Sequence, residues 1–115
     1  MTLTDLVDSY LETWNETDPA GRRKAIDELW APDGVYTDPM VVAAGRDQID
    51  ATIGAVQAQF PGLAFTLHGP VDAHHDTARF SWSLGDELVV GFDVLAVDAG
   101  GQISKVYGFL DKVPS

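Results

Sequence analysis

The apolar spacing of the chain changes once, near residue 63, from a helical pattern to a strand pattern. Before that point apolar residues recur three and four positions apart, whereas after it they alternate or form short runs between turn sequences. Helices followed by a series of strands, rather than strands alternating with helices, predict an α+β fold. Because the chain has 115 residues, of which 45% are apolar, we expect one domain with its own core over residues 1–115.

The helix signals lie in the first 62 residues. We predict helices over residues 3–14, over residues 19–30 and within the segment 43–62. Thr2 with Asp5 resembles a capping box before the first helix, and the proline at position 19 suits the first residue of the second helix. Apolar residues at helical spacing give each helix one side to bury.

Turn sequences divide the rest of the chain into strands. The predicted strands are "LAFTLHGPVDA" with a kink at Gly69-Pro70, then "TARFSWSL", "LVVGFDVLAV" and "QISKVYGFLDKV", and "VYTDP" adds a short extended piece before the third helix. We expect an antiparallel meander. Because only three helices are available to cover one face of this sheet, a bent sheet wrapped by them leaves a conical central cavity where a small molecule can bind.

An aspartate stands in the middle of the apolar strand "LVVGFDVLAV". Gly91 and Leu95, two residues away on either side, place Asp93 on the inward face. Burial of a carboxylate is costly unless the group is paired or takes up a proton. Asp93 is therefore either a functional carboxyl group in a cavity or one half of a structural ion pair with Arg79 or His68.

The composition limits the partners of the chain. Eighteen acidic and seven basic residues give a net charge of −11, which disfavours nucleic acid and anionic membranes. The absence of cysteine excludes disulfides, thiolate metal sites and cysteine nucleophiles. The adjacent His74 and His75 are expected to point to opposite sides of the chain, so we expect no metal site. The N-terminal sequence has neither a basic start nor a long apolar run, and we expect a cytoplasmic protein.

Several motifs occur together in a fixed order: "APDGVYTDP", then "GRDQI" opening a helix, then the aspartate in mid-strand, then "GGQISKVYGF". This ordered set resembles the SnoaL-like and ketosteroid-isomerase-like branch of the nuclear transport factor 2-like superfamily. The resemblance implies a cone-shaped fold in which three N-terminal helices wrap a curved antiparallel sheet around a central pocket. It also implies a homodimer packed through the sheet.

By the same resemblance, three residues match catalytic positions of the ketosteroid isomerases. Tyr10, which precedes Asn15 at the family's spacing, and a protonated Asp93 would donate to an oxyanion, and Asp38 of the Asp-Pro pair would be the general base. Moving a proton between carbons beside a ketone needs a base and donors that stabilise the enolate oxygen. From the residues alone, Tyr10 is equally well a core tyrosine and Asp38 a turn aspartate.

Seven further residues are expected to contribute to an apolar substrate site: Trp14, Tyr36, Phe65, His68, Arg79, Trp82 and Phe109. The orientation of Arg79 separates two interpretations. If Arg79 faces the cavity beside Asp93, the pair suits the water chemistry of epoxide hydrolases or dehydratases; if it faces outward, it is a surface residue. The SnoaL-type polyketide cyclases use an acidic residue just after an aromatic one on the last strand, whereas here Gly108 follows Tyr107.

The sequence therefore predicts a small-molecule pocket protein with an apolar ligand. The most concrete function is a ketosteroid-isomerase-like proton transfer on an apolar ketone, which needs no cofactor. One alternative is a non-catalytic domain of the same fold that binds a hydrophobic ligand or only dimerises. The other is water chemistry by Arg79 and Asp93.

Overall fold

The structure is a computed structural model that describes residues 1–114. Within that range the helices are α1 (Leu3–Asn15), α2 (Pro19–Leu29) and α3 (Arg46–Gln59), and the strands are β1 (Trp30–Thr37), β2 (Val42–Ala44), β3 (Phe65–Leu67), β4 (Asp72–His74), β5 (Thr77–Leu84), β6 (Val89–Val97) and β7 (Ile103–Lys112). None of these helices combines the length and the hydropathy needed to cross a membrane.

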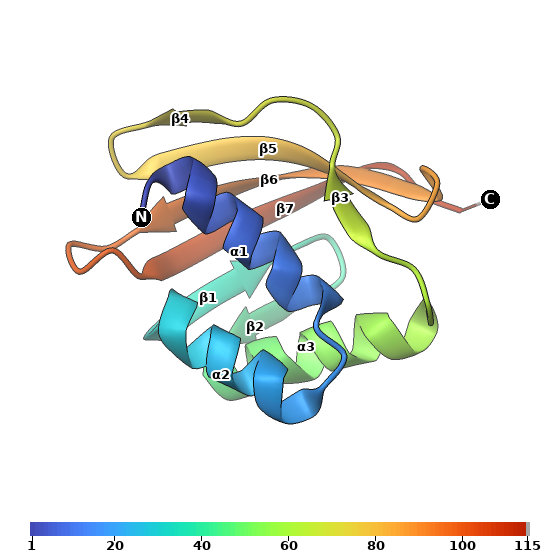
Figure 1. Ribbon diagram of the computed structural model, residues 1–115, viewed down its shortest axis with the longest axis horizontal. Coiled ribbons are helices and arrows are strands. Elements are labelled where there is room, and N and C mark those ends of the chain that lie inside the picture. Colours follow the sequence, from blue (N-terminus) through green and yellow to red (C-terminus); the bar gives the residue numbers. More distant parts are fainter. Residues whose placement is uncertain (115) are drawn as a thin grey trace.

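The strands form one curved sheet in the order β2-β1-β7-β6-β5-β3, and β4 pairs with another part of β5. Every pair is antiparallel except β1 with β7, which run parallel. Figure 1 shows α1 crossing the sheet and α2 and α3 lying beside β1 and β2. The predicted α+β fold, with three helices against a curved sheet, is confirmed, although the sheet is mixed rather than wholly antiparallel.

Helix α1 buries the stripe that its sequence predicts. Thr2 and Asp5 make both hydrogen bonds of the capping box, at 3.1 and 3.3 Å. At the other end, the side chain of Asn15 exchanges hydrogen bonds of 2.8 and 2.7 Å with the backbone of Phe65 and so ties α1 to β3. The buried residues of α1 are Leu6, Val7, Tyr10, Leu11, Thr13 and Trp14.

The second helix ends one residue earlier than predicted. α2 stops at Leu29, and Trp30 is the first residue of β1, where it pairs with Ile103 of β7. The Arg46 guanidinium donates to the Trp30 carbonyl oxygen at 2.6 and 3.1 Å. The spacing of apolar residues predicts only that Trp30 is buried, and it is 1% exposed. Because a strand buries the side chain as well as a helix does, the spacing could not show which of the two contains Trp30.

The long strands alternate between a face covered by the helices and an outer face. On β5, Ala78, Phe80, Trp82 and Leu84 are buried and face the helices. On β6 the inward residues are Gly91, Asp93 and Leu95, as predicted, and all three are buried. The alternation brings the carboxyl group of Asp93 to the same side of the sheet as α1.

Candidate functional site

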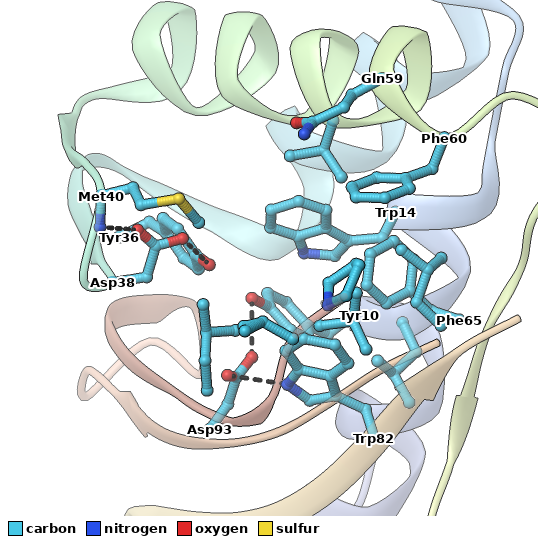
Figure 2. A pocket seen from close by; sticks show the side chains of 17 residues that line it. Tyr10, Trp14, Tyr36, Asp38, Met40, Gln59, Phe60, Phe65, Trp82 and Asp93 are labelled. Atoms are coloured by element: carbon cyan, nitrogen blue, oxygen red, sulfur yellow. Dashed lines mark hydrogen bonds between the residues drawn. The ribbon is translucent and has the colours of Figure 1, made fainter. Parts of the chain in front are cut away.

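A cavity of about 510 Å³ lies between α1, α3, β1 and the inner face of the sheet, a volume suited to a small molecule. Figure 2 shows aromatic side chains on one side of it and the carboxyl groups of Asp38 and Asp93 on others. The lining residues are Tyr10, Leu11, Trp14, Tyr36, Asp38, Met40, Val56, Gln59, Phe60, Phe65, Trp82, Leu84, Val89, Asp93, Leu110, Val113 and Pro114.

Asp93 is buried, at 4% exposed, and each of its carboxyl oxygens accepts one hydrogen bond. The Trp82 indole N–H donates to Oδ1 at 3.0 Å, and the Tyr10 hydroxyl donates to Oδ2 at 3.3 Å. Trp82 reaches Asp93 because the neighbouring strand carries Gly91 opposite it, where a Cβ would lie 2.5 Å from the indole ring. The glycine thus makes room for the ring that positions the carboxyl group.

Burial changes the ionisation of this pair. Loss of hydration raises the pKa of Asp93 from 3.8 to about 7, against the lowering effect of the hydrogen bonds from Trp82 and Tyr10, and the charge of Asp38 adds to the rise. Burial and the nearby Asp93 also raise the pKa of the Tyr10 hydroxyl well above its usual 10. At neutral pH Tyr10 is therefore a hydroxyl donor, and a substantial share of Asp93 carries a proton.

Asp38 has a different environment in the turn from β1 to β2. Its Oδ1 accepts from the backbone N–H groups of Met40 and Val41 at 2.8 and 3.0 Å. Its Oδ2 accepts from the Tyr36 hydroxyl at 2.8 Å. These three donors match the acceptor-only chemistry of an ionised carboxylate. Asp38 is therefore both a turn aspartate and a lining residue of the cavity, and Figure 2 shows its bond to Tyr36.

The two carboxyl groups approach each other around Gly108 of β7. A Cβ on Gly108 would lie 3.0 Å from Asp93 Oδ1 and 3.4 Å from both the Asp38 Cβ and the Tyr36 hydroxyl oxygen. One methyl group would thus touch all three residues. Gly108 stands at the position of the acidic residue of the polyketide cyclases, and its lack of a side chain leaves space between Asp38 and Asp93.

The structure brings seven of the ten sequence-predicted site residues to the cavity: Tyr10, Trp14, Tyr36, Asp38, Phe65, Trp82 and Asp93. Three of the aromatic members pack edge to face, with the ring centres of Trp14 and Phe65 5.4 Å apart and those of Phe65 and Trp82 5.3 Å apart. They form a continuous aromatic wall beside the two carboxyl groups.

The other three predicted residues lie away from the cavity, which corrects the prediction. Arg79 has a 71% exposed side chain and lies 3.3 Å from Asp72, because its position on β5 alternates with the inward Phe80. Phe109 is 48% exposed and stacks on Phe92 across the outer face, since the inward positions of β7 are its even-numbered neighbours. The third residue is His68, whose side chain is exposed and lies beside Glu87.

The histidines are not placed as expected either. The side chain of His68 is 43% exposed and lies 3.7 Å from Glu87 rather than near Asp93. The rings of His74 and His75 do not point to opposite sides: their Nδ1 atoms are 3.2 Å apart, because His75 adopts a φ of 52° in the turn. Across residues 1–114 no three histidine or carboxylate side chains are grouped as a metal site would need.

Two roles at the site were not found by sequence reasoning. Trp82 and Tyr36 were expected only as members of an apolar substrate site, yet each donates a hydrogen bond to a carboxyl group. For Trp82 a signal was present, because Gly91 lies two residues before Asp93 and leaves space for a large ring on the adjacent strand. For Tyr36 the signal was its spacing of two residues from Asp38, which places both on one side of an extended segment.

Residues 7–106 match the family described as SnoaL-like domain. A structure of a proposed isomerase of the SnoaL-like family from Agrobacterium tumefaciens is 38% identical, covers 94% of this chain and 96% of its own, and superposes with a TM-score of 0.90.

More distant structures share the fold. A proposed ketosteroid isomerase from Kribbella flavida is 25% identical over 96% of this chain and 78% of its own, with a TM-score of 0.73. A SnoaL-like protein of unknown function from Burkholderia thailandensis is 16% identical over 93% of this chain and 92% of its own, with a TM-score of 0.76. None of the curated proteins matches this chain.

Proposed function

The chain belongs to the SnoaL-like domain family, and we propose that it catalyses a cofactor-independent proton transfer beside the carbonyl group of an apolar ketone. The reaction moves a carbon–carbon double bond into conjugation with the carbonyl. Asp38 takes a proton from the carbon next to the carbonyl and returns it to the far end of the double bond, so that no atom is gained or lost. The names of the similar Agrobacterium and Kribbella structures point to the same class of chemistry.

The enolate formed in between places negative charge on the substrate oxygen. Tyr10 and the protonated form of Asp93 are the donors for that oxygen. When the ketone binds, the Tyr10 hydroxyl turns from Asp93 Oδ2 to the substrate oxygen, and both groups are buried at one end of an apolar cavity. Fixed donors in a dry site stabilise such a charge better than water does, since they need no reorganisation when the charge develops.

One observation carries this proposal: two carboxyl groups in one cavity have opposite environments. Asp38 accepts three hydrogen bonds from Tyr36 and the turn backbone. Asp93 accepts only two and is 4% exposed, with its pKa raised to about 7 by burial. A base and a neutral acid side by side are what the reaction needs.

The test is turnover of a β,γ-unsaturated 3-ketosteroid, followed by the ultraviolet absorbance of the conjugated product. We expect Asp38→Asn to abolish turnover while the circular dichroism spectrum and thermal transition stay close to wild type. Asp33→Asn, the same change at an exposed aspartate of β1, serves as the matched control and should keep full activity. Equal turnover by wild type and Asp38→Asn would remove Asp38 from the mechanism.

The alternative of a non-catalytic binding domain makes a different prediction in the same experiment. It predicts that no ketone is turned over and that a phenol, which mimics the enolate oxygen, still binds. Water chemistry by Arg79 and Asp93 does not fit the site, because Arg79 lies on the outer face and pairs with Asp72.

We also propose that two copies of the chain pack through the sheet. The outer face carries an apolar patch, called the outer patch below, made of Val90, Phe92 and Val94 of β6 and Tyr107 and Phe109 of β7. Phe92 and Phe109 stack at 4.8 Å, and Tyr107 and Phe109 are 44% and 48% exposed. Contiguous exposed aromatic surface of this kind typically marks an interface.

A further inference from the structure

The polar groups of the cavity are distributed unevenly. Its hydroxyl and carboxyl groups lie at one end, where they bond to one another around Asp38 and Asp93. The lining contains one carboxamide, that of Gln59. Figure 2 shows Gln59 on α3, at the opposite side of the cavity from Asp93. The cavity therefore has a second polar end.

The amide of Gln59 is free to bind a ligand, unlike that of its neighbour on the same helix. Gln57 accepts from Arg22 at 2.8 Å and donates to the carbonyl oxygens of Trp14 and Glu16 at 3.0 and 2.8 Å, so it joins α3 to the α1–α2 segment. Gln59 makes no side-chain hydrogen bond to any residue in the range 1–114. It is exposed and is the last residue of α3, beside Phe60, which also lines the cavity.

The charge of the lining restricts what such a ligand can be. Two carboxyl groups line the cavity, and no lysine, arginine or histidine of residues 1–114 does. An anionic ligand would meet Asp38 without a compensating cation, and the net charge of −11 would add to the repulsion. A carboxamide supplies a donor and an acceptor without charge, which suits a hydroxyl or carbonyl oxygen.

We propose that Gln59 anchors the far end of the substrate, and that the substrate is an uncharged molecule with an oxygen group at each end of an apolar skeleton. The ketone lies at Tyr10 and Asp93, which rests on the proposed function, and the second oxygen group, a hydroxyl or a carbonyl, lies at Gln59. The apolar skeleton between them packs along the wall formed by Trp14 and Phe65. Gln59 in this way determines specificity without taking part in the proton transfer.

The test uses two neutral phenols that differ only at the far end: a biphenyl with one para hydroxyl group and a biphenyl with a para hydroxyl group on each ring. Dissociation constants are measured by quenching of tryptophan fluorescence in wild type, in Gln59→Leu and in Gln102→Leu. Gln102 lies in the turn before β7, outside the lining, and is the matched control. Because Gln59 is exposed to solvent, one hydrogen bond to it is expected to lower the dissociation constant of the dihydroxy compound roughly fivefold relative to the monohydroxy compound.

We expect wild type and Gln102→Leu to bind the dihydroxy compound about fivefold more tightly than the monohydroxy compound, and Gln59→Leu to bind both equally. The proposal would be overturned if wild type bound the two phenols with equal dissociation constants, if the preference for the dihydroxy compound persisted in Gln59→Leu, or if either phenol failed to bind. The proposed reaction is tested separately: a ratio that depends on Gln59, with no turnover of any ketone, would retain the anchor and reject the chemistry.

Discussion

Asp93 shows how the fold changes the chemistry of a single residue. In an unfolded chain its carboxyl group ionises near 3.8, whereas the buried position beside Trp82 and Tyr10 raises its pKa to about 7. Both neighbours donate to it, so its buried oxygens are satisfied in the charged form as well. The same position therefore provides a neutral acid near pH 7 at a cost in folding free energy.

That cost predicts a specific dependence of stability on pH. Between pH 3.8 and about 7 the folded state holds a proton on Asp93 that the unfolded chain has lost. The free energy of unfolding contributed by Asp93 therefore falls as pH rises through this window and levels off above it. Over this window the free energy of unfolding changes by on the order of 4 kcal/mol, because the folded and unfolded pKa values differ by about three pH units and each unit corresponds to about 1.36 kcal/mol.

Urea unfolding of wild type and Asp93→Asn across this range measures that change. Asparagine does not titrate, so we expect Asp93→Asn to gain stability relative to wild type as the pH increases from about 4 to about 8. Other titrating groups cancel in the difference between the two proteins. A difference that stays constant with pH would show that Asp93 ionises as an ordinary aspartate.

Tyr36 is the residue on which the orientation of Asp38 depends. Its hydroxyl donates to Asp38 Oδ2 at 2.8 Å, while the turn backbone holds Oδ1. We expect Tyr36→Phe to lower the turnover number roughly tenfold through loss of orientation and to lower the free energy of unfolding by only about 1 kcal/mol. Ketosteroid turnover and urea unfolding test the two effects, and loss of stability without loss of turnover would make Tyr36 purely structural.

Strand β7 sets the space between the carboxyl groups. Its Gly108 has no side chain where a Cβ would lie 3.0 Å from Asp93 Oδ1. We expect Gly108→Ala to lower the free energy of unfolding by about 1–3 kcal/mol through crowding and to reduce turnover by displacing Asp93.

Gly100→Ala is the control for that change. Gly100 lies in the turn before β7, where a Cβ would lie 3.4 Å from Asp98 Oδ1, an ordinary contact. This variant should keep wild-type turnover. Thermal unfolding and ketosteroid turnover are measured for both variants. Unchanged turnover in Gly108→Ala would mean that the activity does not depend on the space between the two carboxyl groups.

Alternation along the strands explains which site residues could be predicted. The face of Asp93 follows from Gly91 and Leu95, because a strand fixes side-chain direction with a period of two. Arg79 and Phe109 were expected at the cavity because of their residue types. Each lies between two inward residues of its strand, so its own side chain points to the outer face. In both cases the alternation along the strand was a better guide to side-chain direction than the residue type.

The pairing of β1 with β7 assembles the site from distant parts of the chain. It brings the Asp38 turn next to the strand that neighbours Asp93, although the two aspartates are far apart in the chain. The sequence predicted the three helices and the long strands, because their periodicity is local. It did not predict this parallel pairing, since "VYTDP" indicates only an extended piece and nothing nearby in the sequence specifies its neighbour.

The outer patch makes a prediction for the assembly. We expect wild type to have the mass of a dimer in size-exclusion chromatography with light scattering, and Phe109→Glu to have the mass of a monomer, because the new charge would be buried against the second copy. Phe109 lies on the outer face, so the cavity should stay intact and phenol binding should persist. A wild-type monomer at all concentrations would contradict the proposed dimer.

Burial raises the pKa of Asp93 to about 7, whereas Asp38 in the same cavity accepts three hydrogen bonds from Tyr36 and the turn backbone. The most direct measurement is a carbon-13 NMR titration of the aspartate side-chain carboxyl groups, with the Asp93 signal assigned by its loss in Asp93→Asn. We expect this signal to titrate with a pKa of about 7. Titration of Asp93 in the range of exposed aspartates, near 4, would contradict it.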